Sequence, residues 1–350
     1  MKRFFHKLTH WELWPFYIIY APLCFAWIYY AVKAKAFWFF SPVNPTLEFS
    51  GFEGESKKEM YEQLPKKYYP ATLCITSNED VCKLIKKIEQ ANIKYPFITK
   101  PQVGMHALMF RKIENENQLR QYHAYMPFDY ILQQLINLSE FSVFHVRYPD
   151  EEKGKITGLI LKDYLAVTGD GSSALIELIK IHPKAKYREH EMQHKHAAHL
   201  NEVISAGEKY YLSIAGNHNR GARFINLHEE IDERLCNVFD KISKEAGQFY
   251  FGRYDLKCTS LEDLKEGKNI FILEYNGVGA EPNHIYDCGM RYREALKIIA
   301  DHWKDMYRIG KINHRQQSIP YWSFWKGYVH LKKTKQFFKE MRFYDLNCPV

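Results

Sequence analysis

The most hydrophobic part of the chain lies near its N-terminus. Residues 13–32 form twenty consecutive positions without a charge, and an aromatic run over 37–40 follows after Lys33 and Lys35. A stretch of about 20 apolar residues is long enough to cross a bilayer as a helix. Trp, Tyr and Pro crowd this stretch and no small-residue cleavage site follows it, so it is a poor signal peptide. We therefore expect a membrane-associated segment over residues 1–45.

Three interpretations of this segment stay open. Pro15 and Pro22 interrupt it, which favours an anchor that lies in the membrane interface, where Trp and Tyr side chains are enriched. The second interpretation is a helix that spans the membrane. The third is an apolar helix that packs on a soluble body. Lys2, Arg3 and Lys7 precede the segment, so the positive-inside rule weakly places the N-terminus in the cytosol.

After Asn44-Pro45 the pattern becomes that of a soluble protein with both strands and helices. Short apolar or alternating runs predict strands at 72–76, 95–100, 141–147, 156–163, 209–214, 249–257 and 269–275. Amphipathic spacing predicts helices over 78–91, 231–246 and 291–307. Strands mixed with helices indicate an α/β or α+β body.

Composition narrows the class of protein. The 350 residues include 46% apolar and 26% charged side chains, which excludes intrinsic disorder, collagen-like repeats and a coiled coil. This length predicts a core of two or three lobes. The seven cysteines are scattered with no CxxC pair, which argues against a disulfide framework and a zinc ribbon.

The net charge of +8 is concentrated at the two ends of the chain. Residues 1–45 carry five Lys or Arg against Glu12, residues 311–350 carry eight against two acidic residues, and the middle is slightly acidic. A protein that grips nucleic acid with its body should carry the basic excess there, so we expect no nucleic-acid partner. Basic ends beside aromatic clusters suit an anionic membrane surface. For the tail over 311–350, membrane contact and packing on the body both stay open.

Acidic and amide side chains recur on one face of two predicted strands. The two-residue period aligns Arg253, Asp255 and Lys257 on one strand and Glu274 and Asn276 on the other. Such hard oxygen ligands suit Mg²⁺ (or Mn²⁺) that bridges nucleotide phosphates. The alternative is the polar, solvated face of a two-stranded hairpin.

Four short motifs occur in a distinctive order. They are Phe-Ile-Thr-Lys-Pro at 97–101, Ser-Glu-Phe-Ser-Val at 139–143, Gly-Arg-Tyr-Asp at 252–255 and Leu-Glu-Tyr-Asn at 273–276. Over roughly residues 70–310 this order resembles the ATP-grasp superfamily, especially the D-alanine:D-alanine ligase-like carboxylate-amine ligases. The resemblance implies an α+β fold in which two α/β lobes sandwich ATP. It also implies a small N-terminal subdomain at 46–95 and an ATP-grasp domain at 96–310.

The resemblance assigns nucleotide-binding roles to several residues. Lys100 would hold the α- and β-phosphates, and Lys162 would reach the terminal phosphates. Gln133 falls where the family often has a glutamate that faces the adenine amino group. Glu140 falls where the ribose hydroxyls are bound.

The same resemblance assigns the catalytic centre. Asp255, Glu274 and Asn276 match the metal ligands. Arg253 matches an arginine that stabilises negative charge on the transferring phosphoryl group.

Two loops complete the expected site. Gly169 and Gly171 lie in a Gly-rich loop that lacks the P-loop spacing and, taken alone, is an ordinary turn. Its position between candidate ATP-binding strands favours a mobile flap. Arg220 belongs to a later tight loop and is a candidate clamp for a carboxylate or acyl phosphate. Glu281 and His284 are candidates to contact an amine.

These expectations combine into one function. We expect an ATP-dependent ligase that joins a carboxylate to an amine through an acyl phosphate, acting on a membrane-associated, lipid-linked or envelope precursor. The alternatives are a phosphotransferase of the same fold and a catalytically silent membrane-binding protein that retains the fold. A single span would export the body away from ATP, so we expect the catalytic body on the cytosolic side of the cytoplasmic membrane.

Overall fold

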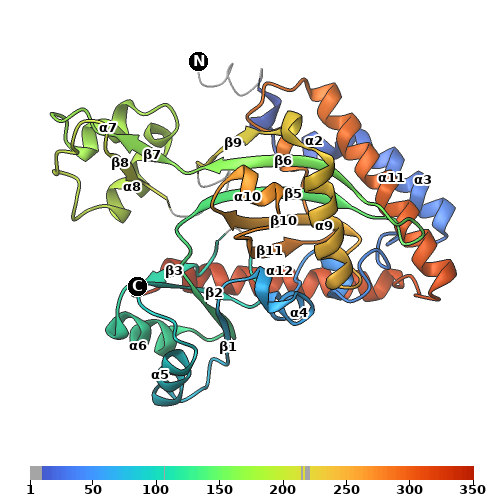
Figure 1. The fold of residues 1–350 in the computed structure, drawn as a ribbon, viewed down its shortest axis with the longest axis horizontal. Coiled ribbons are helices and arrows are strands. Elements are labelled where there is room, and N and C mark those ends of the chain that lie inside the picture. Colours follow the sequence, from blue (N-terminus) through green and yellow to red (C-terminus); the bar gives the residue numbers. More distant parts are fainter. Residues whose placement is uncertain (1–9, 106, 214–215, 217–220) are drawn as a thin grey trace. The chain divides into compact units, whose positions relative to one another are not determined.

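The computed structural model describes residues 10–105, 107–213, 216 and 221–350, and it combines helices with small sheets (Figure 1). The chain forms two compact units. One contains the described residues up to Ile160 together with Asn226–Val350, and the other is Leu161–Ile225. The divisions expected at residues 45, 95 and 310 are different from these and stay predictions.

A four-stranded sheet forms in the first unit between residues 72 and 134. Its order is β1-β4-β2-β3 and its pairs are all antiparallel. Two helices accompany the sheet, and each begins at a residue whose side chain accepts a backbone N–H: Asp80 accepts from Lys83 at 3.0 Å and Asn115 from Gln118 at 3.1 Å. The bounds are β1 Thr72–Ile75, α5 Val81–Gln90, β2 Phe97–Pro101, β3 Arg111–Ile113, α6 Glu116–Tyr125 and β4 Tyr130–Gln134.

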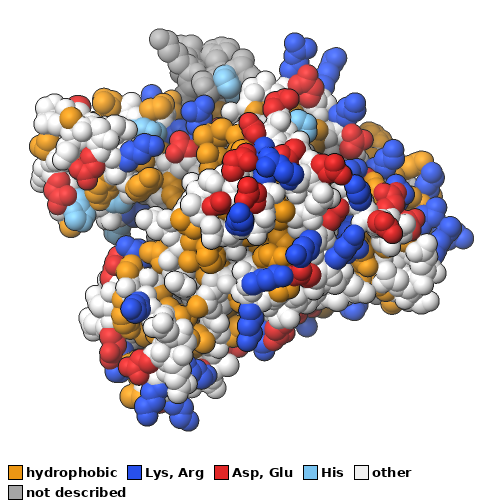
Figure 2. All heavy atoms as spheres, viewed as in Figure 1, with side chains coloured by type: hydrophobic (Ala, Val, Ile, Leu, Met, Phe, Trp, Pro, Cys, Tyr) orange, Lys and Arg blue, Asp and Glu red, His pale blue; other side chains and the backbone are white. Residues whose placement is uncertain are grey.

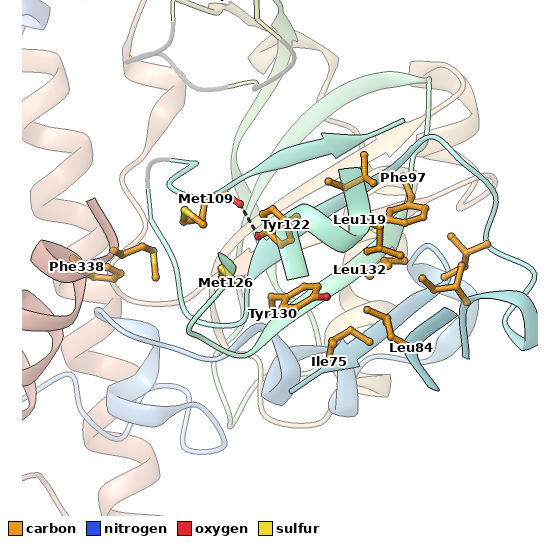
Figure 3. Packing of buried hydrophobic residues seen from close by; sticks show 14 residues of the cluster. Ile75, Leu84, Phe97, Met109, Leu119, Tyr122, Met126, Tyr130, Leu132 and Phe338 are labelled. Atoms are coloured by element: carbon orange, nitrogen blue, oxygen red, sulfur yellow. Dashed lines mark hydrogen bonds between the residues drawn. The ribbon is translucent and has the colours of Figure 1, made fainter. Parts of the chain in front are cut away.

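An apolar core fills the space between this sheet and its helices (Figure 3). Leu84, Phe97 and Leu119 have no exposed surface. Tyr122 is also fully buried, and its hydroxyl donates to the carbonyl of Met109 at 2.9 Å. The buried Tyr122 hydroxyl is therefore paired, as the dashed line in Figure 3 shows and as a stable core requires.

The basic aromatic tail is a helix that reaches this core. Helix α12 spans Phe324–Leu346 and begins at Ser323, whose hydroxyl caps it. Phe338 and Met341 from this helix join the core of the four-stranded sheet. Near the C-terminus, Asp345 of α12 forms an ion pair with Arg111 of β3 at 2.9 Å. Part of the tail is therefore a structural element of the body.

The second sheet has five strands in the order β11-β10-β5-β6-β9. In Figure 1, α9 and α10 lie across one of its faces. Phe239 of α9 packs on Tyr254 of β10, with ring centroids 5.3 Å apart. Figure 2 shows Lys and Arg side chains interspersed with Asp and Glu on this side of the molecule. The bounds are β5 Ser139–Val146, β6 Lys155–Asp163, β9 Arg223–Asn226, α9 Glu233–Glu245, β10 Phe251–Cys258, α10 Leu261–Lys265, β11 Phe271–Asn276 and α11 Tyr292–Gln316.

The N-terminal apolar segment folds as a series of short helices. It contains η1 Trp11–Leu13, α2 Phe16–Tyr20, η2 Ala21–Leu23 and α3 Cys24–Ala34. By length and composition, the described residues contain one helical stretch that could cross a membrane, Phe16–Ala34. Of its 18-residue apolar window, 11% is buried inside the protein. Signal sequences and core helices of soluble proteins meet the same length criterion, although core helices are mostly buried.

The second unit has a small sheet and a core of its own. Strands β7 (Ala166–Thr168) and β8 (Lys209–Tyr211) pair antiparallel. Helices α7 (Leu175–Ile181) and α8 (Glu189–Lys195) pack with them through apolar residues such as Leu175, Ile179 and Met192. Helix α8 contains His190 and His194.

The predicted strands and helices each overlap an observed element. The last predicted helix is longer than expected, because α11 continues to Gln316. The pattern did not reveal α12, the two helices of the second unit, or the short helix α4 (Lys57–Gln63), which is important for the site.

Candidate active site

The predicted metal ligands lie on two adjacent strands of the five-stranded sheet. Strands β10 and β11 pair antiparallel, with Arg253 opposite Asn276 and Asp255 opposite Glu274. Directly opposed residues on one face of a sheet are close enough to interact. The Asp255 side chain is 9% exposed and that of Arg253 is 17% exposed. The face is therefore buried on β10 and partly exposed on β11, where the Glu274 side chain is 32% exposed, which does not fit the fully solvated hairpin considered from the sequence.

Asp255 is the centre of a hydrogen-bonded cluster. Its Oδ2 accepts from Arg253 Nη2 at 3.0 Å and from Asn276 Nδ2 at 3.1 Å, and its Oδ1 accepts from the Ser142 hydroxyl. Burial opposes the charge on the Arg253 guanidinium, but the Asp255 carboxylate outweighs it and raises the pKa of Arg253. Arg253 also donates to the carbonyl of Glu281 at 3.0 Å, which ties β10 to the loop after β11.

A β-bulge presents a backbone carbonyl to this cluster. The register between β10 and β11 shifts after Asp255, so that Leu273 is an extra residue on β11. Its carbonyl accepts from Tyr61 Oη at 2.6 Å and from Lys100 Nζ at 2.9 Å. The bulge therefore joins three elements, because Tyr61 comes from α4 and Lys100 comes from β2.

Glu274 lies between two lysines. Lys57, at the start of α4, forms an ion pair with Glu274 at 2.9 Å. Burial opposes ionisation of Glu274, but the Lys57 and Lys100 ammonium groups hold the pKa of its carboxyl below the ordinary value. Burial is also the main effect on Lys100, and it lowers the pKa of this lysine to about 8. The site thus keeps the ionised carboxylate of Glu274 next to Lys100, whose charged form is destabilised by burial.

Gln133 and Glu140 flank this cluster on neighbouring strands. Gln133 is 3% exposed, and its Nε2 donates to Tyr61 Oη at 2.7 Å and to Thr72 Oγ1 at 2.8 Å. A glutamate could not donate these bonds, which gives a physical reason for the amide at this position. Glu140 is buried on β5, opposite Lys257 of β10. Their contacts to adenine and ribose stay predictions.

Two residues of the cluster were missed by sequence reasoning. Lys57 and Tyr61 lie on α4, which begins at Ser56, whose hydroxyl accepts from Lys58 N at 3.2 Å. Ser56 followed three residues later by Glu59 is a helix-start signal that could have revealed this helix. Nothing in the sequence alone indicates that α4 would lie against β11.

Lys162 and the Gly-rich loop belong to the second unit. Lys162 is partly buried on β6. A Cβ on Gly169 would lie 2.2 Å from the carbonyl oxygen of Ser205, and Gly171 has a φ of +78°, so the turn itself requires both glycines. Asp170 closes the turn by accepting from Ser173 N at 2.7 Å. A flap over the phosphates and a terminal-phosphate contact from Lys162 stay predictions.

The structure describes only some of the candidate substrate residues. Arg220 lies outside the described residues, so the carboxylate clamp stays a prediction. His284 is 3% exposed and packs closely on Gly158. Burial, and then the nearby His228, lower the pKa of His284 to about 4. The His284 ring therefore has the properties of a neutral core histidine.

The donor set at β10 and β11 is compatible with a hard metal ion. Within residues 10–105, 107–213, 216 and 221–350, no group of three or more His, Cys, Asp or Glu side chains could hold a metal ion by itself. Asp255 and Glu274 supply two carboxylates, and Asn276 adds an amide oxygen. Mg²⁺ is usually bound by one or two carboxylates, with water and substrate phosphates completing its shell. These residues therefore fit Mg²⁺ in the presence of a nucleotide.

A second buried polar cluster, separate from the candidate active site, has the residue types of a hydrolase centre. A Ser-His-Asp arrangement does occur between α9 and β5, where Ser243 Oγ lies 3.0 Å from His145 Nδ1 and His145 Nε2 lies 2.8 Å from Asp240 Oδ1. Ser243 is fully buried and His145 is 1% exposed. A substrate cannot reach this cluster, so it is a structural hydrogen-bond network.

Comparisons with known proteins are limited in what they show. No protein-family model matches the chain, and no curated protein matches it. Several solved structures are similar in part. A bifunctional glutathione synthetase from Pasteurella multocida has 15% identity and a TM-score of 0.39, covering 71% of this chain and 36% of that chain.

Two further structures show the same level of similarity. For D-alanine--D-alanine ligase from Bacillus anthracis the identity is 13% and the TM-score 0.40, with 72% of this chain and 68% of that chain covered. For VanG D-Ala:D-Ser ligase from Enterococcus faecalis the values are 13% and 0.42, with 73% and 61% covered. The chain thus spans less than two thirds of the synthetase and of VanG. All three TM-scores are below 0.5, so we draw no conclusion about function from these similarities.

Proposed function

We propose that this chain is an ATP-dependent ligase of the ATP-grasp type that joins a carboxylate to an amine. The observation that supports this most strongly is the cluster at β2, β10 and β11. There the residues that the sequence resemblance selected lie close together: Arg253 and Asn276 bond Asp255, Glu274 is paired with Asp255 across the two strands, and Lys100 bonds the carbonyl of Leu273 next to Glu274. Gathering such charges away from water costs free energy, so a functional reason for the cluster is the simplest one.

Each residue of the cluster has a role in this proposal. Asp255, Glu274 and Asn276 would hold Mg²⁺ (or Mn²⁺), which when bound neutralises charge on the nucleotide phosphates. Lys100 would contact the α- and β-phosphates after its ammonium group leaves the Leu273 carbonyl. Arg253 would stabilise the charge that develops on the transferred phosphoryl group.

The reaction has two steps. A carboxylate oxygen of the acid attacks the γ-phosphorus of ATP, the bond from that phosphorus to the β,γ-bridging oxygen breaks, and ADP leaves. The amine nitrogen then attacks the acyl carbon, the bond from this carbon to the phosphate oxygen breaks, and the nitrogen loses a proton. The products are an amide, ADP and inorganic phosphate.

Release of ADP in the presence of candidate acids and amines tests this function on full-length protein purified in detergent. An acid labelled with ¹⁸O in its carboxylate should transfer label to inorganic phosphate, because one carboxylate oxygen leaves with the phosphoryl group. Label in AMP would mean adenylation and would overturn the acyl-phosphate mechanism. ADP release that needs no amine would favour a phosphotransferase, and nucleotide binding without turnover would favour a catalytically silent protein.

We also propose that the substrate is membrane-associated or lipid-linked and that the body lies on the cytosolic side of the cytoplasmic membrane. The N-terminal segment supports this proposal, because it contacts the chain that follows β11. Trp11 Nε1 donates to the carbonyl of Met290 at 2.8 Å, and Glu12 Oε2 accepts from Asp287 N at 3.1 Å. The segment expected at the membrane therefore contacts residues 287 and 290, a few residues after Glu281 and His284, the candidates to contact an amine.

Protease treatment of oriented membrane vesicles tests the location of the body. We expect cleavage of the body only when the cytosolic face is exposed, because ATP is on that side. Cleavage only from the opposite face would contradict the proposed location. Deleting residues 1–40 would not test the membrane attachment cleanly. Phe39 and Phe40 are fully buried in the core, so their loss would disrupt the fold.

A further inference from the structure

Helix α3 has two apolar sides, and only one of them packs on the body. The ring centroids of Trp27 and Trp303 of α11 are 5.3 Å apart. Tyr30 stacks on Tyr307 of α11 with ring centroids 5.0 Å apart. The opposite side carries Phe25, Ile28, Tyr29 and Val32, at the i, i+3, i+4, i+7 spacing of one helix face. Phe25 is 77% exposed and Val32 is 70% exposed. An outward face on a water-exposed helix would normally be polar.

A second exposed apolar group lies at the start of α12. Phe324, Trp325, Tyr328 and Val329 are all exposed, and Trp325 reaches 70%. These residues are joined to α3 by a chain of ring contacts through Phe37, which lies 6.2 Å from Trp27 and 5.4 Å from Phe324. Phe37, which is 45% exposed, therefore lies between α3 and the start of α12, although almost 300 residues separate these two helices in the sequence.

Charge around this surface favours an anionic partner. The chain has no Asp or Glu from residue 13 to 47, nor from residue 306 to 339. Exposed lysines adjoin both apolar groups: Lys33 and Lys35 at the end of α3, and Lys326, Lys332 and Lys333 on α12. Apolar and aromatic side chains ringed by lysines are the pattern of helices that lie in the interface of an anionic membrane.

We infer that α3 and the start of α12 form a single docking face for an anionic lipid bilayer, and that α3 lies along the bilayer surface without crossing it. If α3 crossed the bilayer with its present packing, α11 would have to enter the bilayer beside it. The inner side of α3 is held against α11, which carries Asp301, Lys304 and Arg308. Carrying such charges into the hydrocarbon layer is strongly unfavourable.

This inference rests on the proposed membrane location and is independent of the ligase chemistry. It extends that location in two ways: the C-terminal helix becomes part of the membrane contact, and the orientation of α3 is specified. Trp11 and Glu12 connect the same segment to the chain after β11, so the docking face would hold the chain near Glu281 and His284, the candidates to contact an amine, close to lipid headgroups.

Vesicle binding by the full-length protein tests the docking face. We expect binding to vesicles of phosphatidylcholine with phosphatidylglycerol, and at least tenfold weaker binding to phosphatidylcholine alone. Trp325→Glu should weaken binding to the anionic vesicles about tenfold or more. The matched control is Ile181→Glu, because Ile181 is 73% exposed on α7 of the second unit. Each lysine of the face that is removed should weaken binding by about fivefold.

The outcomes separate this inference from the proposals on which it rests. Equal binding by Trp325→Glu and wild type would remove α12 from the face. Equal loss in Ile181→Glu would mean that any exposed apolar residue matters, which would overturn the assigned surface. Wild-type protein that binds no vesicles would overturn the membrane location itself, whereas ADP release from soluble substrates would still test the ligase. Unchanged thermal unfolding of each variant shows that the fold is intact.

Depth measurements test the orientation of α3. Spin labels at Phe25→Cys and Val32→Cys, in a protein whose exposed cysteines 24, 74, 82 and 288 are replaced by serine, report how deep each position lies. The two positions are seven residues apart, or about 10 Å along the helix axis. A helix that lies along the surface places both labels at the same depth. A depth difference of about 10 Å would mean a steeply inserted helix and would overturn the orientation.

Discussion

Two regions of the first unit fill buried space in opposite ways. The core of the four-stranded sheet is apolar, and its few polar groups are paired with one another, such as His123 with Tyr130 at 2.8 Å. The junction of β2, β10 and β11 instead gathers Lys57, Lys100 and Glu274 beside the Arg253 and Asp255 pair. The first region needs only stability to explain it.

The two regions differ in the electrostatic free energy that it costs to bury their polar and charged groups. In the apolar core the few buried polar groups are hydrogen-bonded, and burial of the apolar side chains stabilises the fold. At the junction, burial lowers the pKa of Lys100 to about 8, which means that its surroundings do not fully compensate the charge. A lysine kept in such a place is expected to have a ligand, and a polyphosphate supplies the missing negative charge. Four changes would break or sharpen this comparison.

The largest effect is expected from Glu274→Gln. It preserves shape but removes a charge from the proposed metal site, so ATP turnover should fall by on the order of 10³-fold, or about 4 kcal/mol. Steady-state release of ADP measures it. Glu62→Gln on the exposed side of α4 is the matched control. Lys257→Ala is less suitable as a control, because Lys257 is buried and donates to the carbonyl of Leu138. Full turnover in Glu274→Gln would remove this residue from the site.

The second change affects the apolar core. Leu119→Ala on α6 removes a fully buried side chain from the cluster shown in Figure 3 and should lower the free energy of unfolding by about 2–5 kcal/mol. The affinity for ATP should stay the same at temperatures where the variant is folded. Denaturant unfolding and nucleotide binding measure the two quantities. A loss of ATP affinity without a loss of stability would reverse the roles given to the two regions.

The third change should have opposite effects on stability and binding. Lys100→Met keeps an unbranched chain but removes a charge that burial disfavours, so it should stabilise the fold by about 1–3 kcal/mol at pH 7. The Leu273 carbonyl keeps its bond from Tyr61 in this variant. ATP affinity should fall by at least tenfold.

The pH dependence of this stabilisation has a defined sign. Below about pH 8 Lys100 carries its charge in both the folded and the unfolded protein, so the full cost of burial is present. Between pH 8 and the ordinary pKa of 10.5 the folded protein releases the proton first, and the cost disappears. The advantage of Lys100→Met in thermal unfolding should therefore shrink across this window. An advantage that grows with pH would contradict the assignment.

The smallest effect is expected when the pH is lowered. Glu274 has a folded-state pKa below its ordinary value of 4.5, because Lys57 and Lys100 favour the carboxylate over the opposing effect of burial. Its stabilising contribution is present above about pH 4.5 and is lost as the pH falls through the folded-state pKa. The difference in unfolding free energy between wild type and Glu274→Gln should therefore diminish on acidification. A constant difference would mean that Glu274 is not ionised in the folded protein.

Part of the site could be predicted from the sequence because it depends on local periodicity. The period of two places Arg253 with Asp255, and Glu274 with Asn276, on shared strand faces, and both pairs lie so in the structure. The bulge at Leu273 could not be predicted, because it depends on how β11 pairs with β10. Lys57 and Tyr61 were missed for a similar reason, since their contacts to β11 are more than 200 residues away in the sequence.

The fold shows the same division between local and distant information. Most strands follow from short apolar runs bounded by turn residues, as at Phe97–Pro101. The tail was expected only as a basic aromatic segment, whereas Phe338 and Met341 bring α12 into the core of the four-stranded sheet. The lysines spread around this helix hide its apolar stripe from periodicity. The outward face of α3 could be identified only once Trp27 and Tyr30 were seen against α11.

Equilibrium binding of ATP to the full-length protein, with and without Mg²⁺, tests the central claim most directly. We predict one saturable site whose affinity rises with Mg²⁺, a loss of the Mg²⁺ effect in Glu274→Gln, and weaker binding at all Mg²⁺ concentrations in Lys100→Met. The exposed-site control Glu62→Gln should bind like the wild type. Absence of ATP binding, or equal Mg²⁺-dependent binding by wild type, Glu274→Gln and Lys100→Met, would contradict the assignment of the β2, β10 and β11 junction as a nucleotide site.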